Sequence, residues 1–146
     1  MCIRDRARIA MCYPHVYVAS VNIGYNKEQY LKAIKEASLH NGPSLIIAYS
    51  PCIEHGIKTG MQHSQSNGYL ATKCGYFLTF RYNPDTKKFS LDSKEPEFDK
   101  YEDYLMTENR FASLVRKDKE RARLLLEEQK QWAIDRYNYY KKISEE

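Results

Sequence analysis

Cys52 and His55 are the residues whose types and spacing are best suited to chemistry, and they stand in the segment Ser50-Pro-Cys-Ile-Glu-His-Gly56. Cys-x-x-His has the spacing of half a zinc site, and His63 is a further candidate ligand. A thiolate beside an imidazole also has the parts of a nucleophile with its base. The sequence offers no second pair at a zinc-finger distance and no family-type nucleophile signature around Cys52. Zinc binding and nucleophilic catalysis both stay open from the residues alone.

The other cysteines give Cys52 no obvious partner. They stand at positions 2, 12 and 74, and no two of the four form a Cys-x-x-Cys pair. The first residues include charges but no apolar segment of the secretory type, and we therefore expect a reducing, cytoplasmic setting. Isolated cysteines there are commonly free thiols, metal ligands or catalytic groups. A metal site built entirely from this chain is not predicted, and Cys74 is expected to pack as a small hydrophobe.

The composition indicates one globular domain. The chain has 146 residues, of which 42% are apolar and 29% are charged, which suffices for a hydrophobic core. No apolar run approaches the roughly 18 residues that suggest a membrane span, so no membrane association is predicted. The net charge is +4. Because Lys and Glu are interleaved through the C-terminal third, no nucleic-acid partner is predicted.

A strand and a helix are predicted first along the chain. Residues 15–21 are rich in β-branched and aromatic side chains, which favours a strand. Asn26 suits the N-cap of a helix running to about residue 40, and Gln29 stands where a capping box places it. The apolar face expected for this helix is formed by Tyr30, Leu31, Ile34, Ala37 and Ser38.

A second strand is predicted just before Cys52. Asn41-Gly-Pro43 ends the helix, and residues 44–49 form a continuous apolar run. Such a run favours a strand buried on both faces, as in a mainly parallel sheet built from βαβ units. Because ligands of these sheets bind beyond the carboxyl ends of the strands, Cys52 stands at a favourable place for a site.

The rest of the chain predicts further α/β structure with a long C-terminal helix. We expect a helix over 64–74 with Gly75 as its cap, strands over 76–82 and 88–92, and helices from about residue 101. The long helix is predicted over 118–143. Its apolar stripe, which we interpret as helix packing, consists of Ala122, Leu125, Leu126, Trp132, Ala133, Tyr137 and Tyr140.

The first six residues, Met1-Cys-Ile-Arg-Asp-Arg6, match the translation of a transposon-end adapter used in sequencing libraries. We expect this segment to be a scar without structural meaning, in which case Cys2 carries no function. On this interpretation the gene is truncated on its 5′ side, and native sequence begins near Ala7.

Several stretches, in order along the chain, resemble the C-terminal part of the pyruvate:ferredoxin (flavodoxin) oxidoreductase family. They are Arg8-Ile-Ala-Met11, His15-Val-Tyr-Val-Ala-Ser-Val21, Gly42-Pro-Ser-Leu-Ile-Ile-Ala-Tyr-Ser-Pro-Cys-Ile53, His55-Gly-Ile57, Gly60-Met61, Ser64-Gln65, Gly75-Tyr76, Phe80-Arg-Tyr-Asn-Pro84, Phe89-Ser-Leu-Asp-Ser-Lys-Glu-Pro96, Tyr104-Leu-Met106 and Arg110-Phe-Ala-Ser-Leu114. Motifs in this order from Ala7 to the end make the resemblance specific.

The resemblance implies part of a thiamine-diphosphate-binding α/β fold over residues 7–100, with residues 101–146 as a helical extension of the same domain. The cysteine at the position of Cys52 resembles the remote fourth ligand of the [4Fe-4S] cluster nearest thiamine diphosphate. The other three ligands come from a segment upstream in the family. A cluster of this kind takes four thiolates, which accounts for a single cysteine in a suitable loop.

The family's other functional parts are expected outside this sequence. These are the Gly-Asp-Gly and Asn motif for Mg²⁺ and diphosphate, the domains that contact pyruvate and coenzyme A, and a two-cluster ferredoxin-like domain. The resemblance implies a parent oxidoreductase of anaerobic metabolism, expected as a homodimer, that converts pyruvate and coenzyme A to acetyl-CoA and reduces ferredoxin or flavodoxin.

We therefore expect an inactive fragment that lacks the N-terminal domains of its polypeptide. One alternative is a stand-alone subunit that docks onto partner chains supplying the missing ligands. A further alternative is a small zinc-binding α/β protein.

Overall fold

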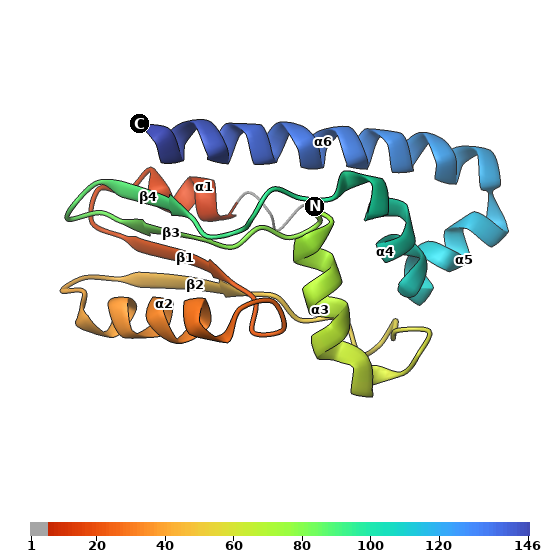
Figure 1. The fold of residues 1–146 in the computed structure, drawn as a ribbon, viewed down its shortest axis with the longest axis horizontal. Helices are drawn as coiled ribbons and strands as arrows, with labels where there is room; N and C mark the ends of the chain where they lie inside the picture. Colours follow the sequence, from red (N-terminus) through yellow and green to blue (C-terminus); the bar gives the residue numbers. More distant parts are fainter. Residues whose placement is uncertain (1–5) are drawn as a thin grey trace.

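One mixed β-sheet with helices on both faces forms the centre of the computed structural model, which describes residues 6–146 (Figure 1). Its strands are β1 (Tyr17–Val21), β2 (Ser44–Ala48), β3 (Phe80–Asn83) and β4 (Lys88–Leu91), in the order β2-β1-β3-β4. The α-helices are α1 (Arg6–Met11), α2 (Lys27–Leu39), α3 (Ser64–Lys73), α4 (Tyr101–Thr107), α5 (Asn109–Lys117) and α6 (Lys119–Glu145). Short 3-10 helices cover Met61–His63 and Phe98–Lys100. Residues 1–5, with most of the expected adapter-derived segment, lie outside the described residues.

The predicted strand–helix–strand unit is confirmed, but the expectation of a mainly parallel sheet is wrong for the described strands. β1 and β2 are parallel, with Val18 opposite Leu45, whereas β3 is antiparallel to both β1 and β4. A tight turn after Asn83 joins β3 to β4, and its Lys87 adopts a φ of 53°. Because β3 and β4 form a hairpin, they cannot both run parallel to β1.

The prediction that residues 44–49 are buried on both faces is wrong, because that environment belongs to β1. All five residues of β1 are buried, with Val18 packed on the side of α1 and α6 and Ala19 packed on the side of α2. β2 forms the edge of the described sheet and alternates between exposed and half-buried residues, with Ile46 36% exposed. The described residues therefore leave part of the apolar surface of β2 exposed.

Helix α2 begins as its sequence predicts. The Asn26 side chain accepts a hydrogen bond from the backbone N–H of Gln29 at 3.0 Å, which is an N-cap. The Gln29 side chain does not complete the capping box, because its amide donates to the Ser20 carbonyl and to Asp92. The predicted apolar face is partly wrong: Ala33 is fully buried, whereas Leu31 is 66% exposed.

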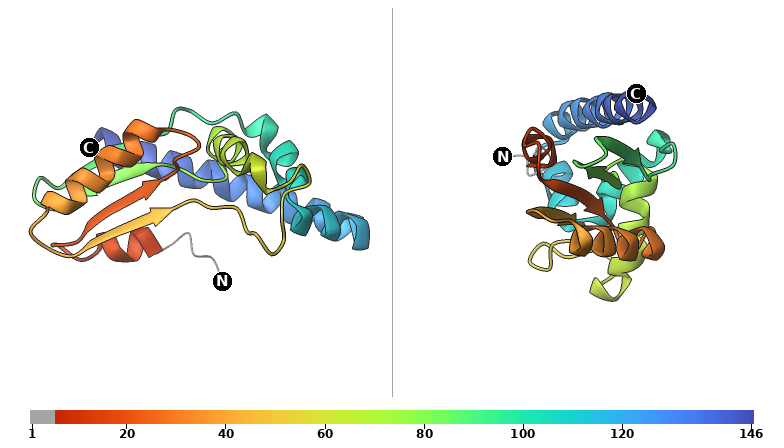
Figure 2. Two further views of the ribbon diagram at one scale, coloured as in Figure 1. Left: turned by 90° about the horizontal axis from the view of Figure 1, so that it is seen from below. Right: turned by 90° about the vertical axis from the view of Figure 1, so that its left-hand side faces the viewer.

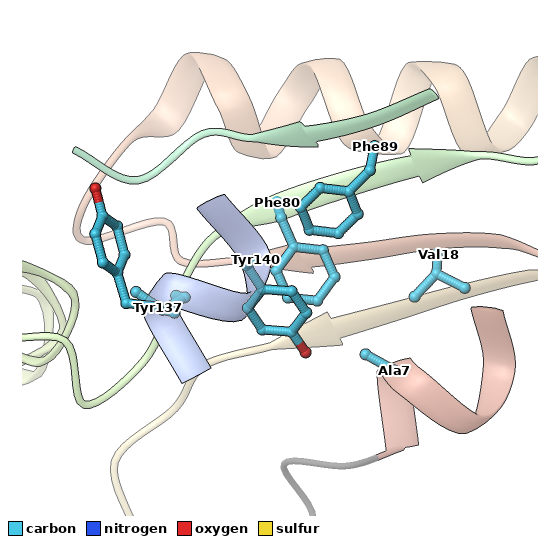
Figure 3. Packing of buried hydrophobic residues seen from close by; sticks show 7 residues of the cluster. Ala7, Val18, Phe80, Phe89, Tyr137 and Tyr140 are labelled. Atoms are coloured by element: carbon cyan, nitrogen blue, oxygen red, sulfur yellow. The ribbon is translucent and has the colours of Figure 1, made fainter. Parts of the chain in front are cut away.

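The main core lies between the sheet and the last turns of α6 (Figure 3). The ring of Phe80 lies 4.7 Å from that of Tyr140 and 5.1 Å from that of Phe89, measured between centroids. α2 covers the opposite face of the sheet, whereas α1 and α6 lie on this one (Figure 2). Aromatic pairs at these distances add to the stability that burial provides.

The long C-terminal helix is confirmed, with Asp118 as its N-cap. Its buried stripe consists of Ala122, Ala133, Tyr137 and Tyr140. The interpretation of Trp132 as a packing residue is wrong for the described chain, because its side chain is 58% exposed. Residues 76–79 do not extend β3 as predicted; Thr79, for example, gives its backbone N–H to the hydroxyl of Ser93 instead of to a strand. Among the helices of residues 6–146, none has the length and apolar composition needed to cross a membrane.

Candidate functional site at Cys52

Cys52 lies in the loop that leaves the carboxyl end of β2, as predicted. The chain turns there, with the N–H of Gly56 donating to the carbonyl of Cys52 at 2.9 Å. Gly56 has a φ of 69°, in the left-handed region that favours glycine. The Cys52 side chain is neither fully buried nor fully exposed. The turn therefore presents the thiol at the end of the sheet where ligands of α/β folds gather.

The surroundings of Cys52 favour its thiolate. The Nδ1 atom of His55 lies 3.1 Å from the Cys52 sulfur. The pKa of Cys52 is lowered from the ordinary thiol value, first by the backbone N–H of His55, then by the His55 side chain and by the backbone N–H of Glu54. Hydrogen bonds to a thiolate stabilise the charged form, and the thiolate is the form that ligates metals and attacks electrophiles.

A cavity of about 380 Å³ opens beside Cys52. Ile47, Phe77, Leu78, Phe80 and Tyr140 supply apolar walls. Its polar lining includes Tyr49, Glu108, Arg110 and Arg136. Arg136 is held in place by donating to the carbonyls of Gly75 and Tyr76 at 2.8 and 2.9 Å. The volume falls in the range of small-molecule pockets. The sulfur of Cys52 therefore borders a space of that size with apolar walls and charged side chains.

Glu108 is a buried charge in this cavity that the sequence analysis did not single out. Its carboxylate accepts a hydrogen bond from Tyr104 at 2.7 Å and lies 2.7 Å from the Nε atom of Arg110. Burial, together with Tyr49 and Glu108, raises the pKa of Tyr104 far above its usual value, so Tyr104 stays a hydrogen-bond donor. The only signal in the sequence is the i,i+4 spacing of Tyr104 and Glu108, which also fits a solvated helix.

The remaining cysteines of the described chain do not join Cys52 in a metal site. Cys12 is exposed, and Cys74 is 2% exposed in the core between α3 and α4, as expected of a small hydrophobe. Burial raises the pKa of Cys74 to about 11. Among residues 6–146, no three His, Cys, Asp or Glu side chains come together as metal ligands. The candidate ligand His63 is exposed, and its ring contacts the side chain of Gln62 at 3.4 Å.

The fold and this loop define an α/β segment that presents one thiol of lowered pKa beyond the end of a parallel strand pair. No family model matches the chain. It is 41% identical over 146 residues to the pyruvate-flavodoxin oxidoreductase of Enterobacter agglomerans and 42% identical over 147 residues to the pyruvate:ferredoxin oxidoreductase of Moorella thermoacetica. Each alignment covers 97% of this chain and 12% of the relative. The pyruvate dehydrogenase (NADP(+)) of Cryptosporidium parvum is 38% identical over 97% of the chain and 8% of its own length.

The chain is therefore homologous to a small segment of the pyruvate:ferredoxin and pyruvate:flavodoxin oxidoreductases, as the resemblance of its motifs predicted. It spans about an eighth of the length of these relatives, since the aligned share is 12%. In each of these relatives, most of the polypeptide lies outside the matched segment.

Proposed function

We propose that the chain is part of a pyruvate:ferredoxin or pyruvate:flavodoxin oxidoreductase and that Cys52 supplies one ligand to a [4Fe-4S] cluster. The observation that carries this proposal is the environment of Cys52, a thiol beyond the end of β2 with its pKa lowered by His55 and Glu54. A thiol whose pKa is lowered gives up its proton at little cost when its sulfur binds iron. Homology to enzymes that carry this name supports the assignment.

The donor set of the described chain fits one ligand of such a cluster and not a whole site. A [4Fe-4S] cluster takes four cysteine thiolates, and residues 6–146 bring no second thiol to Cys52. The other three ligands would come from another part of a longer polypeptide. The relatives, in which this segment is 12% of the chain, have ample room for them.

The sheet supports the further proposal that residues 7–100 are part of a thiamine-diphosphate-binding domain and residues 101–146 its helical extension. No strand among the described residues pairs with the outer edge of β2, although Leu45, Ile46 and Ile47 give it an apolar composition. Proteins rarely leave such an edge open, because it invites pairing with other chains. Further strands of the same domain would cover it in the complete protein.

The role of this chain in the reaction would be to bind one iron of the cluster and to adjust the reduction potential of that cluster. A [4Fe-4S] cluster held here would supply one-electron redox chemistry for the oxidation of pyruvate. Cys52 would bind one iron, and the N–H groups of His55 and Glu54 would donate toward its sulfur. Hydrogen bonds to cluster sulfurs raise the reduction potential by stabilising the more negative state. Acetyl-CoA formation and transfer to ferredoxin or flavodoxin would take place through domains outside this chain.

Sequencing the DNA upstream of codon 7 and expressing the complete reading frame tests this proposal. Continuation into a Gly-Asp-Gly motif supports a segment of a larger enzyme, whereas a ribosome-binding site there supports a stand-alone subunit. In the complete protein, Cys52→Ser should remove one [4Fe-4S] signal from the electron paramagnetic resonance spectrum and about four iron atoms per chain. Cys12→Ser is the matched control and should change neither. An unchanged cluster content in the Cys52→Ser protein would exclude the ligand role.

A further inference from the structure

The junction between α4 and α5 holds the loop that carries Cys52. Glu108 forms an antiparallel bridge with Ile57, and the N–H of Lys58 donates to the carbonyl of Thr107 at 2.9 Å. Asn109 bonds the same loop twice, through its backbone to the Gly56 carbonyl at 3.2 Å and through its side-chain amide to the His55 carbonyl at 3.0 Å. The carboxyl-terminal part of the loop is therefore fixed by backbone contacts to residues 107–109.

The side chain of Glu108 reaches the other end of the same loop. Its Oε1 atom accepts from Tyr104 at 2.7 Å and from Tyr49 at 3.3 Å, and the two tyrosine oxygens lie 2.5 Å apart. Tyr49 directly follows β2 and precedes Cys52 by three residues. One residue thus contacts the chain both before and after Cys52, through its carboxylate and through its backbone.

The carboxylate itself is buried, with hydrogen bonds to one oxygen and an ion pair at the other. The side chain of Glu108 is 4% exposed, and its Oε2 atom lies 2.7 Å from the Nε atom of Arg110. Arg110 in turn donates to the hydroxyl of Tyr76 at 2.8 Å. A buried carboxylate persists only where hydrogen bonds and an opposite charge replace its water. A satisfied buried network of this kind is rigid, and it therefore restricts the positions of the residues that it contacts.

We infer that Glu108 is a positioning residue for Cys52: it fixes residues 49–58 as one rigid loop and so sets where the Cys52 sulfur points. The inference rests on the ligand role proposed for Cys52, because positioning matters only if the sulfur must meet a partner group. Glu108 forms no hydrogen bond with the sulfur, whose side-chain partner is His55. Its effect passes through Tyr104 and Tyr49 on one side and through the bridge to Ile57 on the other.

Hydrogen–deuterium exchange on the 146-residue chain tests this inference. Glu108→Gln keeps the size of the side chain but removes the charge that Arg110 and Tyr104 recognise. Exchange in residues 49–58 should become at least about tenfold faster, the effect expected when a buried hydrogen bond to a charged group is lost. The Cβ resonance of Cys52, followed by selective ¹³C labelling, should shift although Glu108 does not touch this residue.

Ser93→Ala is the matched control. Ser93 is also buried, and its hydroxyl accepts from the Thr79 backbone at 2.6 Å, just before β3 begins and just after β4 ends. It should speed exchange around residues 79–93 and leave the Cys52 resonance in place. The inference is overturned if residues 49–58 exchange equally fast in Glu108→Gln and in the parent chain, or if both variants shift the Cys52 resonance alike.

Asn109→Ala is the second variant, for the case in which Glu108→Gln unfolds the chain and all of its amides exchange rapidly. Asn109 is exposed, and the substitution removes only its side-chain bond to the His55 carbonyl. Exchange at residues 56–58 should rise about threefold, the effect of one ordinary hydrogen bond, while β1 is unchanged. Absence of that local effect would overturn the inference. These measurements need no iron, so they are independent of the ligand role. If the exchange results agree with the inference but the complete protein keeps its cluster after Cys52→Ser, only the ligand role is refuted.

Discussion

The Nδ1 atom of His55 lies 3.1 Å from the sulfur of Cys52, in a turn where the backbone N–H groups of His55 and Glu54 also lower the pKa of the thiol. The His55 ring and two backbone N–H groups thus all favour the thiolate form of one sulfur. This arrangement distinguishes Cys52 from Cys74, whose pKa burial raises to about 11. Of these two thiols, Cys52 therefore ionises the more readily, and Cys74 stays protonated near neutral pH.

This contrast predicts the pH dependence of alkylation. In a chain with Cys2 and Cys12 replaced by Ser, iodoacetamide should modify Cys52 with a midpoint below the roughly 8.5 of a free cysteine. Because the folded-state pKa of Cys52 is depressed, thiolate is present below that pH and is lost only as the pH falls through the lowered value. His55→Ala should raise the midpoint. The alkylation rate at pH 7 should then fall by up to about tenfold for each unit by which the pKa of Cys52 rises.

The control for this measurement is His63→Ala, since His63 is exposed and bonds only weakly to Gln62 at 3.4 Å. It should leave the profile of Cys52 unchanged. A His55→Ala profile that superimposes on that of the parent would show that the imidazole does not stabilise the thiolate.

The packing of the main core predicts a large difference between two aromatic substitutions. Phe80 is 3% exposed and lies between Phe89 and Tyr140, so Phe80→Ala should lower the free energy of unfolding by about 3–5 kcal/mol. Trp132 is 58% exposed, and Trp132→Ala should change it by less than about 0.5 kcal/mol. Urea unfolding followed by circular dichroism measures both. Equal losses would mean that Trp132 packs as the helix periodicity suggested.

Two glycines in the left-handed region predict different tolerance of a methyl group. Gly75 has a φ of 83°, and a Cβ there would lie 2.7 Å from the ring of Phe98. Gly56 has a φ of 69°, but its nearest neighbour, the amide of Asn109, would be 3.4 Å away. Gly56→Ala should cost about 1 kcal/mol for the backbone conformation alone, and Gly75→Ala about 3 kcal/mol because overpacking adds to it. A smaller loss for Gly75→Ala in thermal unfolding would contradict this order.

The helices and strands that local sequence patterns determine were predictable, but the burial of their residues was not. Asn26 marks the start of α2 and Asp118 that of α6, because a cap is a property of a few adjacent residues. The burial of a strand depends on what lies beside it. The apolar run of β2 was interpreted as a central strand, yet β1 is the strand with both faces covered, and β2 lies at the edge of the described sheet.

The candidate site shows the same division. The position of Cys52 beyond β2 followed from the order of strand and loop, and the structure confirms it. The carboxylate of Glu108 was not foreseeable, because 56 positions separate it from Cys52 and only tertiary packing joins the α4–α5 junction to the loop. A polar residue between short helices is usually solvated, so its sequence context favoured the wrong environment.

The ion pairs of Arg81 predict one further stability difference, on the face of the sheet that α2 covers. Its guanidinium lies 2.7 Å from Glu36 and 2.8 Å from Asp92, and its side chain is 13% exposed. The two carboxylates raise the pKa of Arg81, so the charge persists at any pH at which the protein folds. Arg81→Met keeps the stem of the side chain but leaves two carboxylates facing each other without a cation.

We expect Arg81→Met to reduce the free energy of unfolding by about 3 kcal/mol, as is usual when one partner of a shielded ion pair is removed. Arg123→Met, on an exposed position of α6, is the matched control and should change it by less than about 0.5 kcal/mol. Repeating both urea titrations in 0.5 M NaCl separates shielded from exposed charges, because salt screens exposed pairs more strongly. A loss for Arg81→Met that disappears in salt would mean that solvent already screens Glu36 and Asp92 from the guanidinium, and that the pairs add little to the packing of α2 on the sheet.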